Sequence, residues 1–215
     1  MKTKQVVMVN VLGAVVTNMK KTILLIIAFI AYTIIIKTCP AVTAWDKSVI
    51  IFIQEKLSKL PLYLPLLPDC KLYSLMIAIP LIGGSIYFFR KKEWLKAGFI
   101  CSIPLVTFLL NCIIKPIIQR PRPPFELQQV IHPDSFSYVS SHSLVTMALY
   151  GMIIYYFYKN CSNNTIKYSV ITISVLWILF VGLSRIWLGV HNPTDVIGAY
   201  LLGFILLQIY STIRV

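Results

Sequence analysis

Five long apolar stretches, each without a single Asp, Glu, Lys or Arg, constrain the fold of this chain more than any other sequence feature. A helix needs about 20 apolar residues, within a range of roughly 17–25, to cross the hydrocarbon core of a bilayer. A sixth stretch, residues 22–36, is shorter but has polar flanks that can extend it. The sequence therefore predicts an all-α integral membrane bundle of six transmembrane helices. The five charge-free stretches are residues 72–89, 97–114, 143–158, 168–184 and 196–213.

Six spans in 215 residues leave room only for short loops, so we expect one domain over residues 1–215. Residues 5–16 are apolar and follow two lysines, as in a signal peptide. However, they run into Lys20 and Lys21 and lack a small-residue cleavage site. Residues 1–21 are therefore expected to stay as a cytoplasmic N-terminal tail ahead of the first span.

The net charge of +13 is best explained by membrane topology. Cytoplasmic loops of membrane proteins carry an excess of Lys and Arg, and a cytoplasmic N-terminus places most basic residues on that side. A nucleic-acid-binding protein would instead gather them on one soluble face, which six spans do not leave, so no nucleic-acid partner is expected. The cytoplasmic set is Lys2, Lys4, Lys20, Lys21, Arg90, Lys91, Lys92, Lys96, Lys159, Lys167 and Arg214. We expect a multi-pass protein of the cell (inner) membrane.

Three short clusters of ionisable residues lie at the ends of the apolar stretches. Under this topology all three reach the extracytoplasmic side, although none of them enters the positive-inside argument. Three segments of the chain that are far apart in sequence thus converge on one edge of the bundle. The clusters are Lys115 with Arg122, then His142, and finally Arg185 with His191 and Asp195.

The residue types in these clusters are suited to hold and attack a phosphoryl group. Arg offers paired hydrogen bonds to phosphate and Lys a point charge, and preorganised cations stabilise the charge that develops on the transferring group. Two histidines can act as nucleophile and general acid. Asp195, close after His191, can accept the imidazole Nδ1 proton and leave Nε2 free to attack. A single cation at a span end more often anchors to lipid headgroups, but all six residues on one edge favour the phosphoryl site.

Residues 49–60, between the first two spans, have an amphipathic helical pattern. Apolar residues recur at helical spacing, and lysines lie on the opposite face. Such a helix can lie in the outer membrane interface or pack as a loop helix over the bundle. Both alternatives stay open.

The spacing within the clusters resembles the type 2 phosphatidic acid phosphatase family. Its motifs are KxxxxxxRP, PSGH and SRxxxxxHxxxD. The first matches from Lys115 to Pro123, and the third from Ser184 to Asp195. The second matches Val139 to His142, where the proline and the glycine are replaced. The resemblance covers residues 100–203 or so, which form the motif core.

The resemblance implies a role for each site residue. His191 would be the nucleophile that forms a phosphohistidine, Asp195 would orient it, and His142 would protonate the leaving group. No metal and no cofactor are implied. The extracytoplasmic carboxylates, which are Asp46, Glu55, Asp69, Glu126, Asp134 and Asp195, look scattered in the sequence. The phosphate oxygens would be held by Lys115, Arg122, Ser140, Arg185 and the backbone N–H of Ser141.

Two sequence features raise structural questions. The family motif has glycine at the position of Ser141. If that position needs a positive φ, serine there costs about 1 kcal/mol or more of conformational energy. Cys39 and Cys70 both fall on the extracytoplasmic side, and a disulfide between them is an open possibility.

We therefore expect a metal-independent phosphatase that acts on a membrane lipid phosphate or diphosphate at the extracytoplasmic face. Phosphatidylglycerophosphate and undecaprenyl diphosphate are the favoured substrates, with lipid A phosphate as an alternative. A haloperoxidase of the same superfamily would be a soluble protein, and the six predicted spans argue strongly against that class. A non-catalytic lipid-binding or transport protein is the alternative from another class, although transporters usually carry ionisable residues near mid-span. The specific lipid and the oligomeric state stay open.

Overall fold

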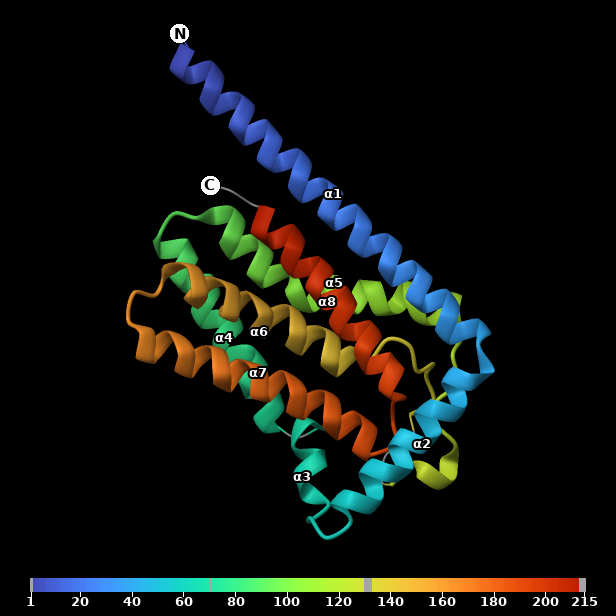
Figure 1. The fold of residues 1–215 in the computed structure, drawn as a ribbon. Coiled ribbons are helices and arrows are strands. Elements are labelled where there is room, and N and C mark those ends of the chain that lie inside the picture. The colour runs from blue at the N-terminus through green and yellow to red at the C-terminus, as the bar shows by residue number, and fades with distance from the viewer. Residues whose placement is uncertain (1, 70, 130–132, 213–215) are drawn as a thin grey trace.

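The computed structural model describes residues 2–69, 71–129 and 133–212, and this part of the chain is helical without a β-strand (Figure 1). Two short 3₁₀ turns, Leu67–Asp69 and Phe125–Leu127, interrupt the loops. The all-α fold expected from the sequence is confirmed. The α-helices are α1 Lys2–Thr38, α2 Pro40–Leu57, α3 Tyr63–Leu66, α4 Lys71–Arg90, α5 Trp94–Ile118, α6 Ser141–Asn160, α7 Asn164–Trp187 and α8 Pro193–Thr212.

Five of these helices are long and apolar enough to cross a membrane, one fewer than the sequence predicts. Among the six spans expected from the sequence, the exception is helix α6, which packs between α7 and α8 inside the bundle. Most of its first half, from Ser143 to Met152, is buried by neighbouring helices. Because protein rather than lipid covers this helix, it tolerates more Ser, Thr and Tyr than a lipid-facing span. The five apolar segments are Asn18–Thr38, Tyr73–Arg90, Trp94–Ile118, Asn164–Trp187 and Pro193–Ser211.

The outer surface of the bundle carries many exposed large apolar side chains. Leu24 of α1, Ile79 of α4, Phe108 of α5 and Leu176 of α7 each expose more than half of their surface. Monomeric soluble proteins rarely expose contiguous apolar surface on this scale. The surface is therefore suited to contact with lipid tails.

Helices α1 and α2 form an arm that reaches the end of the bundle where α7 ends and α8 begins (Figure 1). Helix α1 runs without a break from Lys2, so the residues expected as a tail continue the helix of the first span. The chain turns at Cys39, and Pro40 starts α2 at a position where its missing N–H costs nothing. Ile50 and Asp46 are completely buried. Of the two alternatives for the amphipathic segment, the structure favours a helix packed on the bundle.

The loop between α7 and α8 depends on Gly189. Its φ is +68°, and a Cβ at this position would lie 2.0 Å from the carbonyl oxygen of Leu127. Only glycine adopts this conformation without strain and allows so close an approach. Gln54 of α2 donates to the carbonyls of both Leu127 and Trp187 and closes the same junction. Cys70 lies outside the described residues, so the question of its pairing with Cys39 stays open.

Candidate functional site

All six ionisable residues singled out in the sequence lie at one end of the bundle. This is the end at which α5 and α7 finish, α6 and α8 start, and α2 packs (Figure 1). Helix ends and the loops between them are thus what position the site. Lys115 lies in the last turn of α5, Arg122 in the loop after it, His142 in the first turn of α6, Arg185 in the last turn of α7, His191 in the loop before α8, and Asp195 in the first turn of α8.

The start of α8 is built by the sequence from Asn192 to Asp195. Pro193 is the first helical residue, where proline is favoured. The Asp195 carboxylate reaches back and accepts the backbone N–H of Asn192 at 2.8 Å, which is the carboxylate half of a capping box. Asp195 is completely buried. The helix cap therefore fixes the carboxylate beside the preceding His191.

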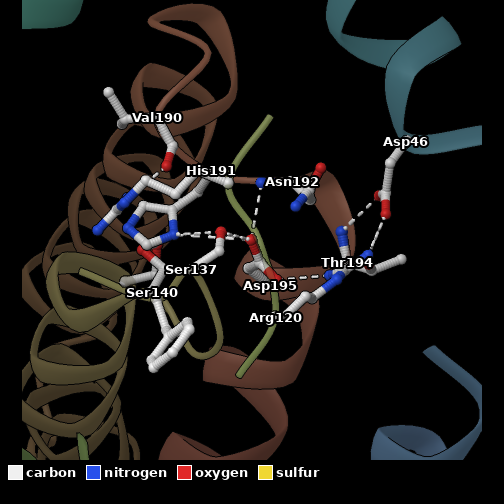
Figure 2. Close-up of polar contacts among 12 residues, drawn as sticks. Asp46, Arg120, Ser137, Ser140, Val190, His191, Asn192, Thr194 and Asp195 are labelled. Carbon is white, nitrogen blue, oxygen red and sulfur yellow. Dashed lines mark hydrogen bonds and ion pairs between the residues drawn. The ribbon is translucent and has the colours of Figure 1, made fainter. Parts of the chain in front are cut away.

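Ser137 links His191 to Asp195 (Figure 2). The Asp195 Oδ2 atom lies 3.7 Å from His191 Nδ1, which is too far for a good hydrogen bond. The Ser137 hydroxyl donates to Asp195 Oδ2 and lies 3.5 Å from His191 Nδ1. Such pairs are often loose in a site without substrate and tighten when it binds. The imidazole is thus oriented by a serine as well as by the carboxylate.

Arg120 joins Asp195 to helix α2. Its guanidinium donates to Asp195 Oδ1 and to Asp46 Oδ2, each at 2.5 Å, and to the Thr194 hydroxyl at 2.7 Å. Asp46 also accepts the backbone N–H and the hydroxyl of Thr194 (Figure 2). Both carboxylates are fully buried, and Arg120 is 7% exposed. This network occupies one oxygen of Asp195 and leaves the other for Ser137, Asn192 and His191.

Three of the six carboxylates expected on this side, Asp46, Asp69 and Asp195, come to the site, and each binds an arginine there. Ser137 and Arg120 are further site residues that the sequence does not predict, although Arg120 lies within the first motif. Within the described residues, no group of three His, Cys, Asp or Glu side chains is placed to hold a metal ion.

Lys115 and Arg122 are anchored by the loop that precedes α6. Lys115 Nζ donates to the carbonyl of Phe136 at 2.8 Å. Arg122 donates from Nε and Nη2 to Ser135 and from Nη1 to the carbonyl of Val190, next to His191. These bonds use three of the five guanidinium N–H groups. Within the described residues, two donors of Arg122 and two of Lys115 have no protein acceptor and can bind an anion.

Arg185 and His142 meet a carboxylate that the sequence did not single out. Arg185 is 2% exposed and forms a two-point ion pair with Asp69, at 2.9 Å from Nη1 and 2.8 Å from Nη2. The same carboxylate lies 3.7 Å from His142 Nε2. Arg185 also donates to the carbonyl of Pro65. The segment between α2 and α4 thus closes this side of the site.

Ser140 and Ser141 lie at the start of α6. Ser140 precedes the helix, and its buried hydroxyl is 3.0 Å from the hydroxyl of Ser143. Ser141 is the first helical residue, and its N–H is one of the amides without an intrahelical acceptor. In the described part of the chain, the non-glycine residues with positive φ are Lys92 and Gln119. The concern that Ser141 requires a glycine conformation is therefore wrong, and its amide can still face an anion.

The electrostatics keep His191 neutral. Burial lowers the pKa of His191 to about 4, with Asp195 acting in the opposite direction and Arg122 and Lys115 lowering it further. At neutral pH the imidazole is therefore unprotonated and holds a lone pair. An oriented neutral imidazole beside two cations is the arrangement that a nucleophile toward phosphate needs.

Comparison with known proteins agrees with the motifs. The pattern of the PAP2 superfamily matches residues 96–215, more than half of the chain. The chain belongs to the PAP2 superfamily. The sequence resemblance to type 2 phosphatidic acid phosphatases is thereby confirmed. Asp46 and Asp69 both lie outside the matched PAP2 residues.

Two curated relatives and one solved structure are similar to this PAP2 protein. Phosphatidylglycerophosphatase B of Bacillus subtilis (strain 168) is 36% identical over 134 residues, which are 61% of this chain and 64% of the relative. Lipid phosphate phosphatase delta of Arabidopsis thaliana is 24% identical over 122 residues, 52% of this chain and 29% of that protein. The matches thus span less than two thirds of either relative.

The solved structure is described as the first transmembrane PAP2 type phosphatidylglycerolphosphate phosphatase from Bacillus subtilis. It matches with a TM-score of 0.67 at 28% identity, over 89% of this chain and 94% of that one. Together with the apolar helices, this match identifies the chain as an integral multi-pass membrane protein.

Proposed function

We propose that this PAP2 protein is a metal-independent lipid phosphate phosphatase whose preferred substrate is phosphatidylglycerophosphate. The observation that carries the proposal is the convergence of three cations, two histidines and a buried aspartate at one end of a membrane bundle. The similarity to phosphatidylglycerophosphatase B supports the choice of lipid. The active site would face the extracytoplasmic side of the cell membrane, as the distribution of basic residues favours.

In the proposed reaction, His191 Nε2 attacks phosphorus while the bond to the leaving alcohol oxygen breaks. His142 gives its proton to that oxygen, and the phosphoryl group stays on His191 as a phosphohistidine. A water molecule, deprotonated by His142, then attacks phosphorus and releases inorganic phosphate and the neutral His191. The site has returned to its first protonation state at the end of this cycle.

The cations supply the electrostatic part of catalysis. Lys115 and Arg122 retain donors that no protein acceptor uses in the described residues, and the amide of Ser141 begins a helix. These groups are proposed to bind the phosphate oxygens and to stabilise the charge on them in the transition state. Ser140 and Arg185 would complete the cradle from α6 and α7.

A cavity of about 760 Å³ beside Arg122 supports a lipid substrate. It lies between the α1–α2 turn and the loop after α5, and apolar residues such as Ile36 and Ile118 line it. Lys37 and Lys47 line it too and are exposed. A lipid that presents its headgroup from the bilayer would find both apolar walls and positive charge on this route.

The test is phosphate release by purified protein in mixed micelles. We expect the fastest release from phosphatidylglycerophosphate, slower release from phosphatidic acid and undecaprenyl diphosphate, and full activity in excess EDTA. His191→Ala should abolish turnover and the acid-labile phosphoenzyme. Lys115→Ala should lower kcat/KM by about a hundredfold, because a charged partner of phosphate is lost.

Lys159→Ala is the matched control, since Lys159 is exposed at the opposite end of α6 and should keep full activity. Two results would contradict the proposal: no phosphate release from any of the lipids, or equal release by wild type and His191→Ala. Activity that EDTA removes and a divalent metal restores would rule out the metal-independent mechanism.

A further inference from the structure

Asp69 lies between His142, the proposed general acid, and Arg185, a proposed phosphate ligand. It lies in the 3₁₀ turn Leu67–Asp69, ahead of α4, and its side chain is 26% exposed. One of its oxygens, Oδ1, accepts from Arg185 at 2.9 Å and lies 3.7 Å from His142 Nε2. A single carboxylate therefore touches α7 and faces the first turn of α6.

Arg185 is nearly saturated by protein acceptors. It donates to both oxygens of Asp69, to the carbonyl of Pro65 and to the Ser184 hydroxyl. These contacts use four of its five N–H groups. The guanidinium is therefore fixed in place by Asp69 and has at most one donor left for a phosphate oxygen.

His142 lies in a surrounding that opposes its protonation. Burial lowers the pKa of His142 to about 4, and Arg185 lowers it as well, with smaller contributions from His191 and Lys115. The nearby carboxylate of Asp69 acts in the opposite direction. Tyr73 of α4 packs against the ring with 5.1 Å between centroids and donates to the His142 carbonyl, without adding a charge.

A general acid must carry its proton when the substrate is bound. Because the cations Arg185 and Lys115 lie nearby, His142 needs negative charge close to its ring at neutral pH. The bound phosphate supplies part of that charge, but the phosphate charge falls on the side where Lys115 and Arg122 neutralise it. Asp69 supplies a fixed negative charge next to Nε2, the atom that faces it.

We propose that Asp69 is a positioning residue for the general acid: its carboxylate holds the protonated His142 ring toward the leaving-group oxygen and neutralises Arg185 beside it. The inference rests on the proposed phosphatase function and extends it to a residue outside the part of the chain that matches the superfamily. Asp69 touches neither phosphorus nor the leaving group and acts through His142.

This role differs in its consequences from a purely structural ion pair with Arg185. If Asp69 supports the acid, the loss of its charge lowers the His142 pKa in the substrate complex, and the basic limb of the kcat profile moves to lower pH. An activated aryl phosphate, whose leaving group needs little protonation, is then nearly unaffected. If Asp69 only holds Arg185, phosphate binding weakens equally for both substrates and the pH profile keeps its shape.

The experiment compares wild type, Asp69→Asn and Asp69→Glu on phosphatidylglycerophosphate and on p-nitrophenyl phosphate from pH 5 to about 9, a range chosen to span the ordinary histidine pKa. Asp69→Asn keeps the size of the side chain and removes its charge. We expect its basic limb for the lipid to move down by about one pH unit, with about a tenfold loss of kcat above the limb. The aryl phosphate should be hydrolysed within about threefold of wild type, and Asp69→Glu should keep most of the wild-type profile.

Asp134→Asn is the matched control, because Asp134 is an exposed carboxylate in the loop before α6. It should leave both profiles unchanged. Equal losses on the two substrates with an unmoved basic limb would overturn the role of Asp69, as would an Asp69→Asn protein that does not fold while Asp69→Glu does not turn over either substrate. Failure of wild type to hydrolyse the lipid would instead overturn the proposed function.

Discussion

Among single residues, Ser137 adds a contact to the proposed nucleophile His191 that the sequence did not predict. Its hydroxyl donates to Asp195 and lies beside His191 Nδ1, so it completes a link that the carboxylate alone leaves open at 3.7 Å. Ser137 is completely buried. A hydroxyl in such a place orients the imidazole through a hydrogen bond and adds no charge.

Ser137→Ala should therefore lower kcat with little change in KM. One neutral hydrogen bond contributes about 0.5–1.5 kcal/mol, which corresponds to a roughly two- to tenfold loss. The measurement is steady-state hydrolysis of the lipid phosphate, together with the rate of phosphoenzyme formation. Ser48→Ala is the control, since the Ser48 hydroxyl is exposed on α2 and donates to the carbonyl of Ala44 in its own helix. An unchanged rate of phosphoenzyme formation in Ser137→Ala would contradict this role.

Sequence reasoning brought together the residues of the three motif clusters but did not predict the acidic partners of their arginines. His191 and Asp195 lie in one helix start, so their proximity follows from a four-residue separation. Asp46 and Arg120 are separated by 74 residues, and Asp69 and Arg185 by 116. No periodicity along the chain predicts such pairs. Helix α2 carries Asp46, Lys47, Glu55 and Lys56, and nothing in their sequence pattern marks Asp46 as the carboxylate that is buried.

At the scale of elements, helix α2 is fastened to the site by one buried ion network. Arg120 binds Asp46 of α2 on one side and Asp195 of α8 on the other, and Asp46 also accepts the amide of Thr194. The sequence predicted an amphipathic helix here and left its location open. The buried Asp46 explains why the helix lies on the bundle, since a buried carboxylate requires charged or polar partners.

Asp46→Ala should destabilise the protein markedly. It removes one partner of a buried arginine and an acceptor of a helix N-terminal amide, and breaking a buried pair typically costs about 3–5 kcal/mol. The measurement is thermal unfolding in detergent, where Tm should fall by several degrees. Lys47→Ala, at the exposed neighbouring position, is the control and should leave Tm nearly unchanged. Equal Tm values for the two variants would mean that the network does not hold α2.

At the scale of the whole molecule, the charge-free stretches were enough to predict a helical membrane bundle. One of the six expected spans, however, is less apolar than a typical lipid-facing helix. Residues 143–158 lack charge, yet they form the interior helix α6, which is not among the five most apolar helices. A stretch without charge is a stretch excluded from water, and either protein or lipid can exclude it. In α6 the neighbouring helices do so, because this helix packs between α7 and α8. Its first turn brings His142 to the site.

The orientation of the bundle in the membrane follows from its basic residues and can be tested by labelling. Basic residues predict that the site end faces the extracytoplasmic side and that the α4–α5 and α6–α7 turns face the cytoplasm. The structure provides exposed positions for the test at both ends: Glu55 and Asp134 at the site end, and Lys91 and Lys159 at the other. Single cysteines at these positions, in a variant whose five native cysteines are replaced, can be probed with an impermeant maleimide on intact cells.

Cysteines at 55 and 134 should label at once, and those at 91 and 159 only after the cells are permeabilised. Each variant must also retain phosphatase activity, which shows that its fold and insertion are intact. The pair at each end serves as an internal control, because two positions at the same end of the bundle have to give the same result. Labelling at 91 and 159 with protection at 55 and 134 would reverse the orientation. The lipid phosphate would then have to reach His191 from the cytoplasmic leaflet.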